Sequence, residues 1–466
     1  MAKDLCSLTI ADAGRLIKSK QISPVELTRA FLDRIAESDA KIDSYLLITK
    51  DVALSEARQA EADIMAGHYR GPMHGIPYAL KDNIETKGIR TTGHSRILID
   101  YVPTEDATVV RRLKRAGAVL LGKTACLEFT HGAPSPDQAW PQARNPWNRN
   151  HGFSGGSSTG SAAAVAAGMA MGALGTDTGG SIRNPSGFTG LAGLMPTYGR
   201  VSRRGVIPYS FTLDHVGPMC WTVEDCALML GAIAGFDPED PGSADEPVPD
   251  FAAGLGKDIG GIRVGVLRSW HEAALAPGDP MRAALEAAVV RLGELGAKID
   301  DVDIGSLDDF NDVKNIIAEA EFCAVHEKDF QERLSVFGES LQYKAAPGLL
   351  IRAVDYIQAM RQRLHMIKRL QKVFRDFDIL VTLVTYEPSP EIVPSGPPRR
   401  AIQAPNCTQP FNVTGNPSIS VCTGFSPKRL PLAMLLVGRH FDEPTLLGLA
   451  HAYQTATPWK ASRPAL

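Results

Sequence analysis

Residues 152–183 hold the feature that most restricts how this chain can fold. Two glycine- and serine-rich turns, Gly155–Gly160 and Thr176–Ser181, flank a stretch with almost no charge or bulk. That stretch, Ser161–Leu174, would be apolar on every side as a helix, and such a helix lies buried. Its alanine and glycine positions let neighbouring elements approach closely. We therefore expect this region to form the packed centre of the fold.

The second turn supplies groups that acyl transfer needs. Glycines allow a tight turn with positive φ, and adjacent amide N–H groups in such a turn can converge on one point. The amides concerned are those of Thr178, Gly179, Gly180 and Ser181. Together they would hold an oxyanion beside the Ser181 hydroxyl, which is the arrangement of a nucleophile in acyl transfer. Two loops that only flank a core helix would have the same composition.

Composition excludes several classes of protein. The chain has 466 residues with a net charge of −3, which gives no reason to expect binding to nucleic acid or to a membrane surface. Seven scattered cysteines form no C-x-x-C or Cys/His group, so no metal site is expected. The beginning of the sequence lacks the apolar core of a signal peptide, and no apolar run reaches membrane-spanning length. We expect a cytoplasmic protein with reduced thiols.

Short apolar runs alternate with helical periodicity, which indicates an α/β sheet. Helices are expected over 7–65, with Ser23-Pro24-Val25-Glu26 as a capping box, and over 106–116, about 279–295, 309–331, 343–376 and 443–455. Strands are expected at Ile76–Leu80, Ala118–Gly122, Ile262–Leu267, about 297–303, Asp378–Thr382, Ser418–Cys422 and Leu432–Val437. Residues 191–223 are expected to form loops with short strands, and Pro388–Pro398 a loop.

The chain is expected to form one domain over residues 1–466. The N-terminal helical region, 1–70, would pack on the outside of a core formed by 71–235. Residues 236–261 are acidic and rich in proline and glycine, which is typical of a surface excursion. Residues 262–466 would complete the sheet and its covering helices.

Two short motifs suggest other chemistries, and their context argues against both. Gly117–Thr124 fits the phosphate-loop pattern, but the Ala-Val-Leu-Leu between its glycines looks like a strand. G-x-S-x-G occurs around Ser154 and around Ser158, but a polar loop precedes it where an α/β-hydrolase has a strand. Neither a nucleotide site nor an α/β-hydrolase site is expected.

A lysine suggests a third possibility. Lys81 closes the predicted strand at 76–80, and a buried ammonium is costly unless it is paired or neutral. A neutral lysine can act as the base for a serine hydroxyl. Ser157 and Ser181 are far enough apart for an intervening helix to return the chain to one place. Composition alone does not connect Lys81 with these serines.

Longer segments closely resemble the amidase signature family. The resemblance is carried by GGSSTGSAAAVAAG at 155–168 and by LGTDTGGSIRNPSGFTGLAGLMPTYGRVS at 174–202. Five more segments look like family segments in family order, at 76–84, 117–129, 213–219, 410–421 and 430–443. The resemblance therefore covers most of the chain from about residue 70 to 457.

The resemblance implies a single α/β/α sandwich around a large mixed β-sheet, and a serine–serine–lysine triad. Lys81 would be the buried neutral base. Ser157, which in this family typically sits on a cis peptide bond, would relay protons. Ser181 would be the nucleophile that forms an acyl-enzyme, with the oxyanion held by the amides from Thr178 to Ser181.

Three further roles follow from the same resemblance. Ser158 would hydrogen-bond near Lys81, and Asp177 and Arg183 would pair to hold the second turn. No metal or other cofactor is implied. The protein would act on a small molecule, without nucleic acid or membrane, as a monomer or homodimer.

The substrate is less well defined, because the family cleaves C–N bonds in amides, aryl amides, ureas and carbamates (urethanes). Residues that would line the substrate entrance are Tyr78, Phe129, Thr130, His131 and Phe188. Their aromatic share suggests an apolar or aryl substrate. The alternative is the glutamine-hydrolysing A subunit of a tRNA-dependent amidotransferase, which uses the same triad, although 329–364 lacks a run typical of such proteins.

Overall fold

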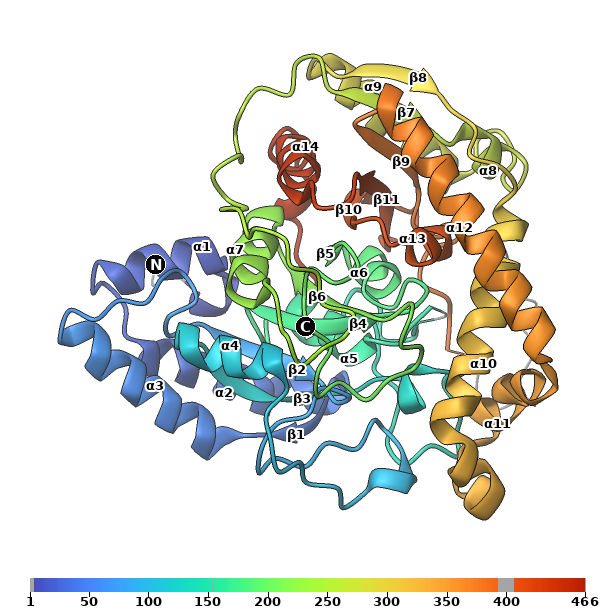
Figure 1. The fold of residues 1–466 in the computed structure, drawn as a ribbon. Coiled ribbons are helices and arrows are strands. Elements are labelled where there is room, and N and C mark those ends of the chain that lie inside the picture. Colours follow the sequence, from blue (N-terminus) through green and yellow to red (C-terminus); the bar gives the residue numbers. More distant parts are fainter. Residues whose placement is uncertain (1–3, 154, 393–405, 466) are drawn as a thin grey trace.

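Eleven strands form one mixed β-sheet in the part of the chain that the structure describes (Figure 1). The structure is a computed structural model that describes residues 4–153, 155–392 and 406–465. Across the sheet the strands are β1 (Tyr45–Ile48), β3 (Val119–Thr124), β2 (Pro77–Lys81), β4 (Gly172–Asp177), β6 (His215–Cys220), β5 (Ala192–Met195), β10 (Ser418–Phe425), β11 (Pro431–Gly438), β9 (Ile379–Leu383), β7 (Arg263–Val266) and β8 (Lys298–Asp301). β2 is parallel to β3 and β4, β7 is parallel to β8 and β9, and the other neighbours are antiparallel.

Helices pack around this sheet, and the predicted α/β/α architecture is confirmed. The α-helices are α1 (Ile10–Lys18), α2 (Pro24–Ser38), α3 (Lys50–Met65), α4 (Thr108–Ala116), α5 (Thr159–Ala166), α6 (Arg183–Thr189), α7 (Val223–Ile233), α8 (Arg268–Glu272), α9 (Pro280–Glu294), α10 (Leu307–Arg333), α11 (Glu339–Ala345), α12 (Ala353–Asp376), α13 (Gln409–Thr414) and α14 (Glu443–Thr455). In Figure 1, α1–α4 gather on one side of the molecule and α10–α12 on the other. Within the described ranges, no helix combines the length and apolarity that crossing a membrane requires.

Two parallel neighbours bring the predicted catalytic segments together. β2 ends at Lys81 and β4 ends at Asp177, and the register pairs Leu80 with Leu174. Because the carboxyl ends of parallel strands meet at one edge of a sheet, Lys81 lies level with the end of β4. α5 packs against both strands and follows directly after Ser157 and Ser158. The sheet edge, the start of α5 and the turn after β4 therefore converge.

The uncharged stretch 161–174 differs from the prediction, because it is not one helix. α5 ends at Ala166, and β4 begins at Gly172. Between them the chain turns at Gly168, whose φ is +68°. A run that is apolar throughout has no periodicity that separates a buried helix from a buried strand, so the sequence did not reveal this boundary.

Two other predicted helical regions are interrupted. Tyr45–Ile48, inside the predicted helical region 7–65, forms β1 at the edge of the sheet. The predicted helix 343–376 is divided by a 3₁₀ segment at Ala346–Leu350, where Pro347 has no N–H to donate. Each remaining predicted helix and strand matches an observed element of the same type. The predicted loop 388–398 falls partly outside the described residues.

The N-terminal region and the acidic segment both pack on the remainder of the chain. Ser23 caps α2 as predicted, accepting hydrogen bonds from the amides of Val25 (3.0 Å) and Glu26 (3.2 Å). Residues 236–261 contain no helix or strand, yet Phe251 within them is buried. One sheet contains strands from before and after this segment.

We predict that Gly160→Ala destabilises the fold by about 1–3 kcal/mol, because an added methyl group in a close-packed core forces neighbouring atoms to move. A Cβ at Gly160 would lie 2.4 Å from both the Ala125 nitrogen and the Ser44 oxygen, which are backbone atoms. Gly231→Ala in α7 is the matched control, since no heavy atom lies within 4 Å of its Cβ position. It should stabilise by about 0.5–1 kcal/mol. Thermal unfolding checks both, and equal midpoints for the two variants would contradict the prediction.

Candidate active site

Lys81 and Ser157 form a buried contact at the end of β2. Lys81 Nζ lies 2.6 Å from Ser157 Oγ and 2.7 Å from Thr176 Oγ1, and both Lys81 and Ser157 are fully buried. Burial lowers the pKa of Lys81 from 10.5 to about 8. The neutral form that a general base requires is therefore a minor fraction of Lys81 at pH 7 and grows as the pH approaches 8.

The two glycine–serine turns are joined by hydrogen bonds. The Gly156–Ser157 peptide bond is cis. The Ser158 amide donates to the Ser181 carbonyl oxygen (3.2 Å), and the Ser158 hydroxyl donates to the Thr176 carbonyl oxygen (3.2 Å). Ser158 thus holds the first turn against the second, and it directly follows the serine that contacts Lys81. Ser154, the centre of the rejected G-x-S-x-G motif, lies outside the described residues.

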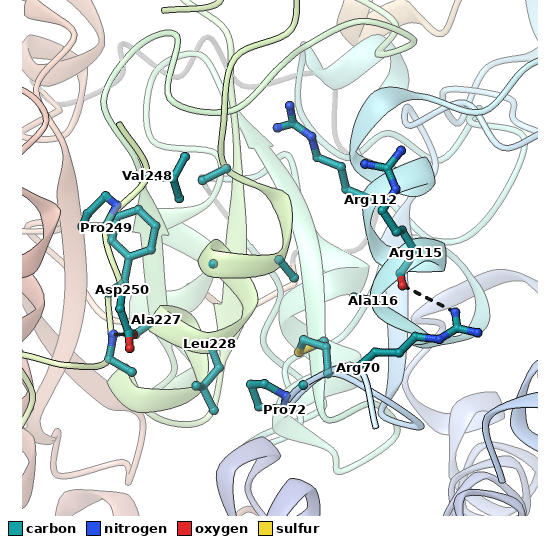
Figure 2. A pocket seen from close by; sticks show the side chains of 17 residues that line it. Arg70, Pro72, Arg112, Arg115, Ala116, Ala227, Leu228, Val248, Pro249 and Asp250 are labelled. Carbon is teal, nitrogen blue, oxygen red and sulfur yellow. Dashed lines mark hydrogen bonds between the residues drawn. The ribbon is translucent and has the colours of Figure 1, made fainter. Parts of the chain in front are cut away.

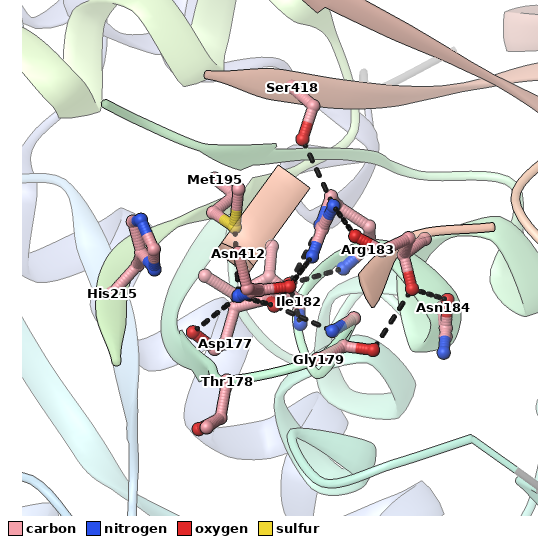
Figure 3. A network of polar contacts seen from close by, with 12 residues as sticks. Asp177, Thr178, Gly179, Ile182, Arg183, Asn184, Met195, His215, Asn412 and Ser418 are labelled. Carbon is pink, nitrogen blue, oxygen red and sulfur yellow. Dashed lines mark hydrogen bonds and ion pairs between the residues drawn. The ribbon is translucent and has the colours of Figure 1, made fainter. Parts of the chain in front are cut away.

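Asp177 is the hub of the second turn (Figure 3). Its Oδ1 accepts from the Gly180 amide (2.7 Å), and its Oδ2 accepts from the Ile182 amide (2.9 Å). Arg183 adds two bonds from the side, Nε to Oδ2 at 3.0 Å and Nη2 to Oδ1 at 2.8 Å. Burial alone would raise the pKa of Asp177, but Arg183 and these hydrogen bonds hold it well below its usual value.

Arg183 connects this turn to the C-terminal part of the chain. Nη1 donates to the Thr408 carbonyl oxygen (2.8 Å) and to Ser418 Oγ (3.1 Å), and Nη2 donates to Asn412 Oδ1 (2.5 Å). Asn412 in turn donates through Nδ2 to Asp177 Oδ1 (2.9 Å). All five N–H groups of the guanidinium are therefore engaged. The pairing of Asp177 with Arg183 is observed, and the contacts from residues 408–418 were not predicted.

A cavity opens beside Ser181. Ser181 and Gly179 border it, whereas the Gly180 amide, one of those predicted to hold an oxyanion, donates to Asp177. Thr178 lies behind, where its hydroxyl donates to Asp214 Oδ1 (2.5 Å). Other polar residues around this cavity are Thr130, His131, Asn184, Tyr209, Lys314, Lys344, Asn406 and Gln409.

Only two of the five residues predicted to line the entrance border this cavity, Thr130 and His131. Phe129 packs instead against His326, with ring centroids 4.3 Å apart, and Phe188 faces Phe153 at 6.4 Å. Tyr78 is fully buried in β2, three positions before Lys81. Because strand side chains alternate between faces, Tyr78 points away from the face of Lys81.

Sequence reasoning missed the polar residues that α10 and α11 contribute. Lys314 and Glu319 lie on α10 and are almost fully buried, and Lys344 lies on α11. His131 Nε2 lies 2.8 Å from Glu319 Oε2, and Tyr209 donates to Glu319 Oε1 (3.0 Å). Charged residues on long helices usually face solvent, so nothing in the sequence distinguished these from their exposed neighbours.

A second cavity lies away from Ser181 (Figure 2). Its volume is about 650 Å³, whereas the cavity beside Ser181 has a volume of about 60 Å³. α4, α7 and residues 248–252 line the larger cavity, with arginines on one side and apolar groups on the other. Arg112 in this cavity donates to the carbonyl oxygens of Ile233, Gly235 and Phe236. None of its lining side chains is a serine, cysteine or histidine. The smaller cavity, which Ser181 and His131 line, is therefore the candidate active site.

The described residues contain no group of three or more histidine, cysteine, aspartate or glutamate side chains arranged to hold a metal ion. All seven cysteines are free and buried. The polar groups around Ser181 are hydroxyls, amides, ammonium groups and the His131 imidazole, which suit an organic ligand with hydrogen-bonding groups.

The fold and the comparisons place the chain in a class of enzymes that cleave C–N bonds of amides. The sequence matches the family described as Amidase over residues 26–447, and the chain belongs to this family. The resemblance stated above is thereby confirmed.

Individual relatives share nearly the full length of the chain. The A subunit of the glutamyl-tRNA(Gln) amidotransferase of Moorella thermoacetica is 38% identical, with 99% of each chain covered. A chain of a solved structure superimposes with a TM-score of 0.91 at 29% identity, covering 98% of this chain and 100% of the other. That structure is described as a vestigial protein complex that reveals the evolutionary origins of an s-triazine catabolic enzyme. The peptide amidase of Stenotrophomonas maltophilia has a TM-score of 0.83 at 31% identity, with 98% of each chain covered.

We predict that Arg183→Met destabilises the protein by about 3–5 kcal/mol and abolishes activity, because it leaves the Asp177 carboxylate buried without its cation. Arg352→Met is the control, since Arg352 pairs with Asp355 at the surface and its side chain is 75% exposed. That change should leave the unfolding midpoint unchanged. Thermal unfolding and activity measure both variants. A normal midpoint for Arg183→Met would refute the structural role of the pair.

We predict that kcat/KM rises with pH and levels off near pH 8. Lys81 must be neutral to accept a proton, and its pKa is lowered to about 8, so the active fraction grows about tenfold per unit below that value. Initial rates from pH 6 to 9 with one amide substrate test this. Lys81→Ala should show no such rise in its residual rate. A flat profile for the wild type would mean that Lys81 is not the base.

Proposed function

We propose that the chain hydrolyses an amide through an acyl-enzyme on Ser181, with Lys81 and Ser157 as the proton relay. The observation that carries the proposal is the 2.6 Å contact between Lys81 Nζ and Ser157 Oγ inside the core. No carboxylate of the described residues contacts Lys81, which lies next to a serine and near the Ser181 turn, and this is the position of a general base.

In this mechanism Ser181 Oγ attacks the carbonyl carbon of the amide. Its proton passes to Ser157 as the Ser157 proton passes to Lys81. The amides of Gly179 and Ser181, two residues that line the cavity, stabilise the oxyanion, because the Gly180 amide already donates to Asp177. Collapse of the intermediate breaks the C–N bond, and the leaving amine takes up the proton through Ser157. Water then attacks the acyl-enzyme by the same relay and releases the carboxylic acid.

Glutamine is the substrate that we propose to test first. The amidotransferase relative is 38% identical to this chain over almost its whole length, against 29–31% for the two structures compared. The cavity beside Ser181 is also lined mainly by polar side chains. Both observations favour a glutamine-hydrolysing A subunit over an enzyme that cleaves an aryl amide or a carbamate.

A free-standing amidase is the second candidate, and its support is structural. The peptide amidase of Stenotrophomonas maltophilia, whose name does not describe an amidotransferase, matches this chain with a TM-score of 0.83 at 31% identity. In this case the substrate is a small-molecule amide or carbamate and the protein is a monomer or homodimer. With glutamine as substrate, tRNA and a partner protein would belong to the complex, contrary to the expected absence of nucleic acid. We propose a cytoplasmic location in either case, because all seven cysteines are free thiols.

We predict that Ser181→Ala lowers kcat at least about 10⁴-fold on every amide that the wild type hydrolyses, because the nucleophile is lost. Glutamine, a p-nitroanilide and a p-nitrophenyl carbamate serve as substrates, with ammonia and the nitro-aromatic products measured. Ser269→Ala, at an exposed serine of α8, is the control and should retain wild-type rates.

The substrate pattern separates the two candidates. Ammonia release from glutamine, raised by a co-purified second protein, supports the amidotransferase function. Turnover of the anilide or the carbamate without glutamine hydrolysis supports the free-standing amidase. Wild-type activity in Ser181→Ala would show that another group is the nucleophile.

A further inference from the structure

The cavity beside Ser181 has a surplus of positive charge. Lys314 from α10 and Lys344 from α11 both line it, while none of its lining residues in the described chain is an aspartate or glutamate. Neither ammonium forms an ion pair with a carboxylate among the described residues. The proposed reaction uses neither lysine.

Lys314 lies deep in this cavity and reaches the Ser181 turn. Only 5% of it is exposed. Its Nζ lies 3.3 Å from the Tyr209 hydroxyl and 5.1 Å from the centroid of that ring. On the other side it packs against the turn, since a Cβ at Gly179 would lie 3.0 Å from Lys314 Cε and 3.6 Å from Nζ. Lys314 is therefore placed to contact a ligand bound at Ser181.

The buried carboxylate of Glu319 is already occupied. One oxygen lies 2.8 Å from His131 Nε2, and the other accepts from the Tyr209 hydroxyl at 3.0 Å. Burial opposes ionisation of Glu319, but His131 and the lysines hold its pKa below the usual value. Burial also lowers the pKa of Lys314 to about 8, so Lys314 is mostly protonated at pH 7. The single carboxylate of Glu319 thus faces the two ammonium groups of Lys314 and Lys344. One positive charge beside the cavity is left without a compensating anion.

We propose that the substrate carries a carboxylate, which Lys314 and Lys344 bind next to the amide that Ser181 attacks. This inference rests on the proposed function and narrows it to acid amides, in which a carboxylate and an amide belong to one small molecule. Glutamine and the monoamides of dicarboxylic acids are two sources of this chemistry. The predicted apolar or aryl substrate does not fit two ammonium groups beside the nucleophile.

Two amides of equal length provide the test. Succinamate and butanamide differ in that a carboxylate of the first replaces a methyl group of the second. Wild-type kcat/KM should be at least about tenfold higher for succinamate, because hydrogen bonds to a charged group are stronger than those to neutral groups. Equal values for the two amides would overturn the proposal. Adding glutamine identifies the source, because a preference for glutamine over succinamate indicates the amidotransferase type of substrate.

Variants show whether the lysines cause the preference. Lys314→Met and Lys344→Met should each lower the ratio of the two kcat/KM values by about tenfold, mainly through KM for succinamate. Lys344 is only half-buried, so its variant tests the proposal even if Lys314→Met folds poorly. Lys328→Met, at a lysine of α10 that is 82% exposed, is the matched control and should leave the ratio unchanged. An equal loss with both amides in both variants would mean that the lysines act on the oxyanion or on folding, and would overturn carboxylate binding.

A binding measurement separates this proposal from the proposed function. Calorimetry with Ser181→Ala should detect succinamate binding that weakens at least about tenfold in Ser181→Ala/Lys344→Met. Hydrolysis that depends on Ser181 but shows no preference would refute the carboxylate site and leave the amide hydrolase intact. Succinamate binding without any hydrolysis by the wild type would support the carboxylate site and refute the amide hydrolase. Absence of both the binding and the preference would refute the carboxylate site.

Discussion

The buried pair of Asp177 and Arg183 is the interaction on which the rest of the site depends. Removing both charges from water is costly, and only a complete set of partners offsets that cost. Asp177 obtains its partners from the turn that carries Ser181, and Arg183 obtains its partners from residues 408–418. The same bonds that satisfy the charges therefore fix the nucleophile turn to the C-terminal strands. The Asp177–Arg183 pair therefore contributes both to the stability of the fold and to the position of Ser181.

Two buried lysines on neighbouring strands differ in their local partners. The difference separates a lysine with a structural role from one that is suited to proton transfer. Lys123 on β3 lies 3.6 Å from Asp82 and donates to the Ile84 carbonyl oxygen (2.6 Å), so its charge is compensated. Lys81 on β2 contacts hydroxyl and carbonyl oxygens, and no carboxylate pairs with it among the described residues. Burial lowers the pKa of both. A lysine that lacks a counterion gives up its proton more readily, which suits Lys81 for proton transfer and Lys123 for holding β3.

The sequence predicted the parts of the site that lie within continuous segments. Lys81, Ser157 and Ser181 fall in long, specific motifs, and the structure brings Lys81 into contact with Ser157 beside the Ser181 turn. Residues that reach the site from distant helices were missed, because a lysine such as Lys314 has no local pattern that marks it as buried. The prediction for Tyr78 was wrong for a different reason, because alternation of side chains along a strand places residues 78 and 81 on opposite faces. The boundary between α5 and β4 was hidden by a run without periodicity.

The order of strands in the sheet has a consequence for how the chain is made. β10 pairs with β5 and β11 pairs with β9, so the C-terminal hairpin is the join between the earlier and later parts of the sheet. β5 therefore presents an unpaired edge until β10 has been made, and β9 presents one until β11 has been made. Open edges are templates for pairing with other chains, and long-range pairing is slow. A ribosome stalled before β11 would therefore hold a nascent chain that has most of its strands but an open edge at β9, and such an edge favours aggregation.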